Sequence, residues 1–129
     1  MEKKRTTAMD LIECHKYDQL VTVQSDDLIS FAIEKMEQYD ISQIPVTENS
    51  SIIGALDDVH LYAHLIKDPT LKLKEVKEIL QAPFPFVDTN SPIEEITSKI
   101  NKKNNAVLVK DHEGRIHIIT RQDIIQGIK

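Results

Sequence analysis

The chain has 129 residues and a formal net charge of −5, from 16 basic and 21 acidic side chains. This length suits one ordinary domain, and the acidic balance leaves no broad basic surface of the kind that binds nucleic acid. The only cysteine, Cys14, cannot form an intrachain disulfide, and no apolar run approaches membrane-spanning length. We therefore expect a cytoplasmic protein with no membrane segment and no nucleic-acid partner.

The first predicted element is a short helix in "TAMDLIEC". Thr7 and Asp10 stand at capping-box spacing before Leu11 and Ile12. A short β-branched stretch at 20–23 then predicts a strand. Asp26 or Asp27 can cap the helix that follows, which presents four apolar residues on one face: Ile29, Ala32, Ile33 and Met36.

Two strands and a second helix complete this unit. The apolar runs "QIPVT" and "SIIGAL" are separated by the polar turn "ENS", and a helix is predicted from about Asp58 to Ile66. The resulting order is β-α-β-β-α. The linker after it has Pro69 as a helix stop, prolines that keep its end extended, and a short predicted helix carrying Leu73, Val76 and Leu80.

The same order of elements recurs as an internal repeat. The segment "VTVQSDDLISFAIEKM" aligns with "PFVDTNSPIEEITSKI" at an offset of 64 residues, and "IPVTENSSIIGALDDVHL" aligns with "VLVKDHEGRIHIITRQDI" at an offset of 63. Because one unit of about 60 residues buries its surface poorly, the pair is the expected folding unit. We divide the chain into 1–68, the lead-in helix and first motif, and 69–129, the linker helix and second motif.

This pattern resembles a pair of cystathionine-β-synthase (CBS) domains, the Bateman module. The tandem β-α-β-β-α order, the apolar-Pro-Val strand in "QIPVT" and a strand that runs into Thr-x-x-Asp carry the resemblance over nearly the whole chain. Within this family, the sequence most resembles the C-terminal regulatory region of pyridoxal-phosphate-dependent cystathionine β-synthases and their bacterial relatives. It implies an α/β pseudo-twofold pair with no catalytic residues, no intrinsic cofactor and no metal. The implied partners are a second copy, bound through the helices, and the catalytic domain of a parent enzyme.

The stretch "IITRQD" has two interpretations. Thr120 can cap the last helix with Asp123 at its third position, which is a structural role alone. Alternatively, the helix N-terminus and the Thr120 hydroxyl attract a phosphate or another electron-rich group, and Asp123 accepts both hydroxyls of a ribose. The resemblance favours the second interpretation and implies an adenosyl site made by Leu20, Val21, Thr22, Ile41, Ser42, Gln43, Ile44, Ile118, Thr120, Gln122 and Asp123.

The first motif departs from this pattern. Asp57 stands where Thr120 does, and His60 stands where Asp123 does. A carboxylate repels phosphate, and a neutral imidazole cannot accept two hydroxyls as a carboxylate can. We therefore predict one competent site, on the second motif. There His117 replaces the glycine that remains as Gly54 in the first motif, and its side chain is expected to narrow the approach to the site.

The ligand and the class of function have alternatives. AMP or ATP needs cations near its phosphates, and Arg121 is the one within the motif, whereas S-adenosylmethionine carries a sulfonium that suits a carboxylate such as Asp40. The sequence favours S-adenosylmethionine or AMP over ATP. The alternative function is a dimerisation module without a nucleotide ligand.

Two other groups of residues have the composition of a functional site. Asp57, His60 and His64 share one face of the predicted helix, and two imidazoles one turn apart can hold zinc. Core-facing leucines on the same helix explain this spacing without a metal. A nucleophilic Cys14 would need a base and an orienting group that the sequence does not place.

Overall fold

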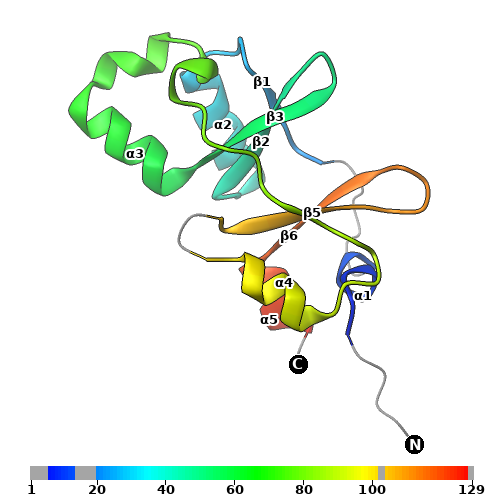
Figure 1. The fold of residues 1–129 in the computed structure, drawn as a ribbon. Coiled ribbons are helices and arrows are strands. Elements are labelled where there is room, and N and C mark those ends of the chain that lie inside the picture. Colours follow the sequence, from blue (N-terminus) through cyan, green and yellow to red (C-terminus); the bar gives the residue numbers. More distant parts are fainter. Residues whose placement is uncertain (1–5, 14–19, 102–103, 128–129) are drawn as a thin grey trace, which may run out of the picture. The chain divides into compact units, whose positions relative to one another are not determined.

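The computed structural model describes residues 6–13, 20–101 and 104–127. The chain divides into two compact units. Residues 21–83 form the first-motif unit, and residues 1–20 with 84–129 form the second-motif unit. Each contains one three-stranded sheet with helices (Figure 1), so the predicted α/β fold class and the tandem repeat are confirmed.

The first-motif unit follows the predicted β-α-β-β-α order. Its sheet has the order β1-β2-β3, with β1 parallel to β2 and β2 antiparallel to β3. Its core is formed by the helices and the sheet together, with Ile29, Ile44 and Leu56 fully or almost fully buried. The elements are β1 (Val23–Gln24), α2 (Ile29–Tyr39), β2 (Gln43–Glu48), β3 (Ser51–Asp57), α3 (Asp58–Lys67), and the 3-10 helices η1 (Pro69–Leu73) and η2 (Val76–Ile79).

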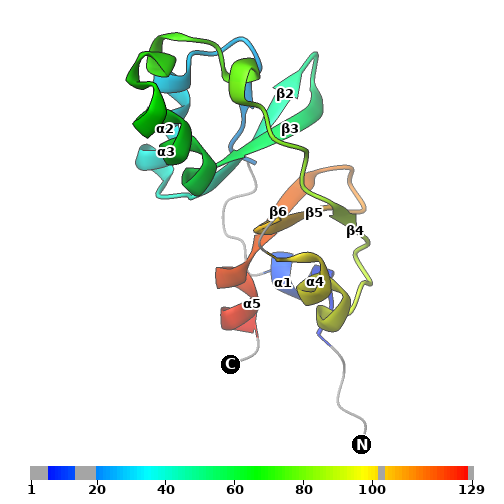
Figure 2. The same ribbon diagram turned by 60° about the vertical axis from the view of Figure 1, so that its left-hand side comes forward.

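The second-motif unit repeats this topology. Its sheet has the order β4-β5-β6, again with one parallel and one antiparallel pair. Figures 1 and 2 show its three helices gathered along one face of the sheet. The elements are α1 (Ala8–Ile12), β4 (Phe86–Val87), α4 (Ile93–Lys99), β5 (Ala106–Lys110), β6 (Ile116–Thr120) and α5 (Arg121–Gly127).

The start of the first motif differs from the sequence prediction. β1 begins at Val23 rather than at residue 20, and the N-cap of α2 is Leu28, which makes no side-chain cap. The predicted cap Asp27 instead accepts a hydrogen bond from the Gln24 N–H at 2.8 Å and closes the turn before the helix. The N–H of Ile29 donates to the Lys74 carbonyl at 2.9 Å, so linker backbone replaces the missing cap.

The linker forms two 3-10 helices rather than the single helix predicted. The N–H groups of Val76 and Lys77 donate to the carbonyls of Asp27 and Ser25, at 2.8 and 3.0 Å. These N–H groups therefore cannot make the hydrogen bonds that a continuous helix requires. Val76 is fully buried by this contact, whereas Leu73 remains 76% exposed. The linker thus packs on the motif that precedes it.

The segment in front of the repeat packs on the motif that is distant in sequence. The predicted helix is confirmed as α1, with its Thr7–Asp10 capping box. Ala8, Leu11 and Ile12 lie in the core of the second-motif unit. Thr7 forms an isolated antiparallel β-bridge with Pro92. In the other unit, Glu75 of the linker forms the same kind of bridge with Leu28. The division at residue 68 follows the order of the motifs, whereas each compact unit contains the flanking segment of the other motif.

No helix among the described residues is both long and apolar enough to cross a lipid bilayer.

Candidate functional site

Thr120 and Asp123 form a closed hydrogen-bonded pair at the β6–α5 junction. The Thr120 N–H donates to Asp123 Oδ2 at 2.9 Å, and the Thr120 hydroxyl donates to the same oxygen at 3.2 Å. This is the half of a capping box in which the third helical residue bonds the backbone of the cap. Asp123 and Ile118 are half-buried and Gln122 is exposed, so this part of the predicted site reaches the surface.

The same pair occurs elsewhere in the chain with the same geometry. At the start of α1, Asp10 Oδ2 accepts from the Thr7 N–H at 2.9 Å and from the Thr7 hydroxyl at 3.2 Å. The pair is therefore sufficient to explain a helix cap and does not by itself identify a ligand site. Thr120 differs in position, because it lies at the end of a strand, opposite Ala106 at the start of β5.

The corresponding junction of the first motif is closed by a glutamine from the linker. Asp57 is 5% exposed, and its Oδ1 accepts from the His60 N–H at 2.9 Å and lies 2.8 Å from His60 Nδ1. Gln81 completes the network: its Oε1 accepts from the Asp57 N–H at 2.9 Å and its Nε2 donates to Asp57 Oδ2 at 3.2 Å. Sequence reasoning missed Gln81, because a polar linker residue 24 positions away gives no signal.

Asp57 is held as a carboxylate in this network. Burial raises its pKa, but hydrogen bonds from the His60 backbone, the His60 side chain and Gln81 together outweigh burial and hold the pKa below the ordinary value of 3.8. The α3 N-terminus therefore already carries a negative charge whose hydrogen bonds are internal. An anionic group would meet repulsion at this position.

Gly54 and His117, at equivalent positions of β3 and β6, differ in the space that they leave for a neighbouring segment. A Cβ on Gly54 would lie 2.6 Å from the Gln81 carbonyl oxygen, so only glycine lets the linker pair with Ala55 through two 3.0 Å hydrogen bonds. His117 has a side chain at this position, 8% exposed, and its Nε2 lies 2.8 Å from Asp111 Oδ2. This contact, the largest cause, lowers the pKa of Asp111.

The predicted site residues of the β2 region lie at the same edge of the first-motif sheet as Asp57. Gln43 pairs with Asp57 and is 7% exposed, and its Oε1 accepts from the Ser42 hydroxyl at 2.9 Å. Ile44 is fully buried in the core of the unit. The Gln43 and Ile44 side chains are therefore occupied by internal contacts, whereas Ser42 is exposed.

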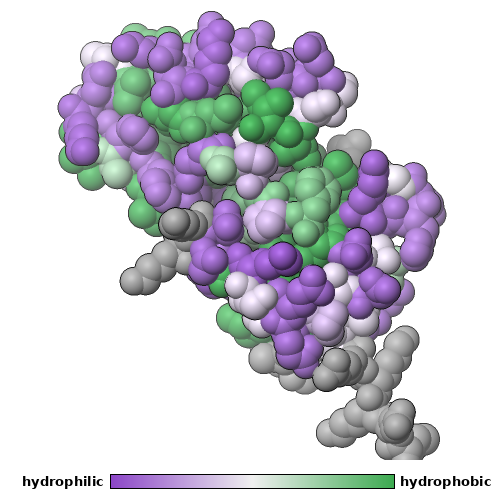
Figure 3. Space-filling view, in the orientation of Figure 1, coloured by the Kyte–Doolittle hydropathy of each residue, from purple (hydrophilic) through white to green (hydrophobic). Residues whose placement is uncertain are grey.

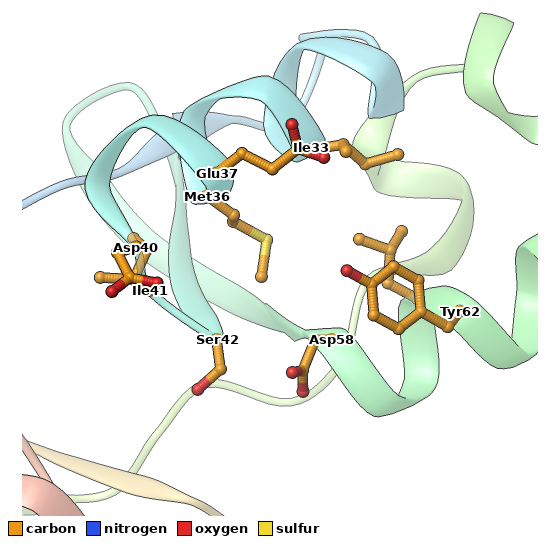
Figure 4. A pocket seen from close by; sticks show the side chains of 9 residues that line it. Ile33, Met36, Glu37, Asp40, Ile41, Ser42, Asp58 and Tyr62 are labelled. Carbon is orange, nitrogen blue, oxygen red and sulfur yellow. The ribbon is translucent and has the colours of Figure 1, made fainter.

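The remaining predicted residues of the first-motif unit line two different cavities. Ile41 and Ser42 line a cavity of about 380 Å³ between α2 and α3 (Figure 4). Thr22 lines another, of about 490 Å³, and its carbonyl accepts a 2.6 Å hydrogen bond from Lys35 Nζ. Leu20 and Val21 are half-buried just before β1. Thr22 is thus not gathered into one cavity with Ile41 and Ser42.

The rival metal site receives no support from the described residues. In the part of the chain that the structure describes, no group of three or more His, Cys, Asp or Glu side chains is arranged to hold a metal ion. His60, one of the candidate ligands, contacts Asp57 and Gln81 instead. Cys14 lies outside the described residues.

Comparison with known proteins gives a consistent family. The family model described as "CBS domain" matches residues 15–67 and 76–129. An inosine-5'-monophosphate dehydrogenase of Methanocaldococcus jannaschii is 32% identical over 113 residues, which are 85% of this chain but only 22% of the relative. The chain thus spans about a fifth of that relative's length.

Two solved structures have the same fold. The CBS domain pair of protein MJ0100, in complex with 5-methylthioadenosine and S-adenosyl-L-methionine, matches with a TM-score of 0.77 and 19% identity, over 96% of this chain and 100% of that one. CBSX2 in complex with AMP matches with a TM-score of 0.72 and 19% identity, over 95% of each chain. The tandem fold predicted from the repeat is therefore confirmed.

Proposed function

Because the chain belongs to the CBS domain family, we propose that it is a regulatory module that senses an adenosyl ligand and has no catalytic activity of its own. One observation carries the proposal: the two motifs differ at the strand-to-helix junction. The first is closed by Asp57 and Gln81, whereas the second has the Thr120–Asp123 pair, in which Asp123 Oδ2 accepts hydrogen bonds from the Thr120 N–H and hydroxyl. The second motif is the proposed ligand site.

The proposed contacts follow from the chemistry of the Thr120–Asp123 pair. A carboxylate has about four acceptor positions, so the cap on Asp123 Oδ2 is compatible with acceptance from ribose hydroxyls. The apolar side chain of Ile118 offers a surface for a purine. We propose that residues 20–22 and 41–44 supply the remaining wall, as the CBS resemblance implies.

S-adenosylmethionine and AMP are the proposed ligands in preference to ATP. Arg121 is the cation adjacent to Thr120, and its guanidinium already donates to the Asn101 carbonyl at 3.1 Å. A triphosphate needs several cations, whereas a monophosphate or a sulfonium needs few or none. Proteins of this fold have been solved with AMP and with S-adenosylmethionine, which supports both candidates.

The enzyme that this module regulates is proposed in more general terms than its ligand. The sequence resembles regulatory regions of cystathionine β-synthases, whereas the curated relative is an inosine-5'-monophosphate dehydrogenase. We propose that ligand binding shifts the balance between two states of an attached or partner enzyme, with a cystathionine β-synthase as the candidate from the resemblance. Two copies of the chain are proposed to pair through their helices.

The ligand proposal is tested by a thermal-shift series with S-adenosylmethionine, AMP, ADP and ATP, confirmed by titration calorimetry. A ligand that binds only the folded state raises the melting temperature. We expect a shift with S-adenosylmethionine or AMP that is lost in Asp123→Ala. The matched control is Asp10→Ala, which breaks the same cap geometry at α1 and should lower stability while the ligand-induced shift remains.

Assembly without a ligand is the second candidate function. It is favoured by the exposed apolar residues of α3, where Val59 is 71% and Ile66 is 82% exposed. If none of the four nucleotides shifts the melting temperature and sedimentation gives the mass of a dimer, the module is an assembly device and the adenosyl proposal is wrong.

A further inference from the structure

A pocket of about 490 Å³ lies at the end of the first-motif sheet that is remote from Asp57. Residues of β1 and α2 line it, together with residues at the turn between β2 and β3. Asp57 pairs with Gln43 at the start of β2, whereas this pocket lies where β2 ends. Its volume is within the range of sites that bind small molecules.

The charged residues of the lining are one acid and one base, Asp27 and Lys35. Lys35 Nζ donates to the Thr22 carbonyl at 2.6 Å, and Asp27 Oδ2 accepts from the Gln24 N–H at 2.8 Å. Backbone groups two residues apart point to the same side of an extended segment. Both charges are therefore held along one edge of β1.

Asp27 and Lys35 retain hydrogen-bonding capacity after these contacts. The contacts occupy one oxygen of Asp27 and one of the three donor positions of Lys35. In the part of the chain that the structure describes, the two side chains form no ion pair with each other. Asp27 Oδ1 and the remaining donor positions of Lys35 are thus available to a molecule in the pocket.

An exposed aromatic ring accompanies the two charges. Phe31 stands four residues after Asp27 and four residues before Lys35, and it lines the same pocket. Its side chain is 45% exposed, and Lys35 Nζ lies 5.7 Å from the centre of its ring. The ring therefore offers apolar surface to a bound molecule directly beside the ammonium group.

The turn between β2 and β3 contributes polar side chains in an unfavourable backbone conformation. Asn49 and Ser50 line the pocket with φ values of 51° and 68°, and glycine is the residue that such a turn favours at its second central position. The other hairpin uses Gly114 for its φ of 86°. Ser50 instead retains a hydroxyl at this place, and hydrophilic side chains gather at the tip of this hairpin (Figure 3). Left-handed residues other than glycine are found preferentially at ligand sites.

The second-motif unit has a pocket at the equivalent place without this combination. That pocket, of about 610 Å³, is lined by β4, the turn after it and the β5–β6 hairpin. In the repeat, Ser91 stands at the position of Asp27 and Glu95 at the position of Phe31. The set of carboxylate, aromatic ring and ammonium is therefore not a requirement of the repeated fold.

We propose that the first-motif pocket binds a free α-amino acid with an apolar side chain. Lys35 binds its carboxylate, Asp27 Oδ1 accepts from its ammonium group, and its side chain packs on Phe31. A zwitterion matches two opposite charges that share a pocket without pairing, whereas a ligand with one charge leaves the other unmatched. This inference goes beyond the proposed adenosyl function, because it concerns a second ligand and does not involve Thr120 or Asp123.

Titration of the isotope-labelled protein, followed by the chemical shifts of its backbone amides, tests this site. The probes are L-leucine, L-methionine, L-phenylalanine and two analogues of leucine: isocaproate, which lacks the ammonium, and isoamylamine, which lacks the carboxylate. We expect saturable shifts at Gln24, Asn49 and Ser50 with the amino acids. Leucine should bind about tenfold more tightly than either analogue, because each analogue loses one charge-assisted contact. The amides of Asp88 and His112, in the equivalent pocket, should not shift.

Two substitutions separate binding from a structural role. Asp27→Asn retains an acceptor for the Gln24 N–H, and it should weaken leucine about tenfold while the affinity for isocaproate stays unchanged. Lys35→Met should weaken leucine to a similar extent while the affinity for isoamylamine stays unchanged. The matched control is Lys99→Met, the repeat equivalent of Lys35, which should bind leucine as the wild type does.

The possible outcomes are distinct from those of the adenosyl experiments. Absence of a saturable shift with all three amino acids overturns the proposal. Equal affinities for leucine and both analogues also overturn it, because the pocket would then recognise apolar surface alone. Asp123→Ala should keep the amino-acid shifts at Gln24, Asn49 and Ser50, so a failure of the adenosyl proposal leaves this measurement unaffected.

Discussion

Thr7 and Thr120 head the same Thr-x-x-Asp pattern, and in both the threonine N–H and hydroxyl donate to one oxygen of the aspartate. The residue types alone therefore determine the cap and leave the ligand role open. Position separates the two: Thr7 precedes a helix that is buried in a core, whereas Thr120 is half-buried at the end of β6, an outer strand of its sheet. In the first motif, Asp57 caps α3 although the Thr-x-x-Asp pattern is absent there.

Asp57→Ala should destabilise the protein by about 1–2 kcal/mol at pH 7, because the His60 N–H and the Gln81 amide lose their acceptor. Urea unfolding followed by circular dichroism measures the free energy of unfolding. Asp57→Asn is the matched control, since it retains one acceptor oxygen and should lose less. Equal stability of Asp57→Ala and the wild type would show that the network contributes nothing.

The contribution of the Asp57 charge should depend on pH in one direction. The pKa of Asp57 is lower in the folded state than its ordinary value of 3.8, so the unfolded chain binds the proton more tightly. The stabilisation is complete above pH 3.8 and is lost as the pH falls through the folded pKa. The stability difference between wild type and Asp57→Asn should therefore shrink between pH 5 and pH 2 (approximate limits); a difference that grows on acidification would contradict the assignment.

The elements themselves were largely predictable, and the contacts of the flanking segments were not. Periodicity and turn residues predicted both β-α-β-β-α units and the α1 cap. The sequence could not predict that Lys74 would replace a side-chain cap on Ile29, or that Val76 would bond Asp27, because these are backbone contacts between distant segments. Such contacts are independent of residue type, so they leave no pattern to read.

Each compact unit contains the flanking segment of the other motif, and this arrangement predicts which strands a core mutation destabilises. Leu11→Ala removes a side chain that is 2% exposed in the second-motif core and should cost about 2–4 kcal/mol. Amide hydrogen exchange should then show faster opening of β5 and β6, distant in sequence, with less effect on β2 and β3. Val76→Ala should have the opposite distribution. Faster exchange in β2 and β3 after Leu11→Ala would contradict this packing.

The approach of the linker to β3 makes Gly54 sensitive to a single methyl group. In Gly54→Ala the new Cβ would lie 2.6 Å from the Gln81 carbonyl oxygen, so the linker must move, at a cost of about 1–3 kcal/mol. Exchange of the Ala55 and Gln81 amides should accelerate. Gly114→Ala is the control: it has open space around the Cβ and only the strain of a φ of 86°, so these two amides should keep their protection.

At the scale of the molecule, the sequence predicted an asymmetry between the motifs. The structure supplies a physical reason for it at the β3–α3 junction, which Gln81 closes by hydrogen bonds to Asp57. The substitution of Thr and Asp by Asp57 and His60 was visible in the sequence, but the role of Gln81 was not. The eleven predicted site residues are divided between the two units, so their assembly into one adenosyl site remains a proposal that binding measurements must test.

The asymmetry predicts the stoichiometry of ligand binding. If the second motif alone is competent, each chain should bind one adenosyl molecule. Asp57 repels the phosphate of AMP, and for either ligand the hydrogen bonds of Asp57 are already made within the protein. Equilibrium dialysis with radiolabelled AMP or S-adenosylmethionine gives the number directly. Gln81→Ala opens the first junction without removing the Asp57 charge, so the number for AMP should stay at one in this variant. Two molecules per wild-type chain would mean that the linker yields to the ligand, and the first motif would then have to be counted as a site.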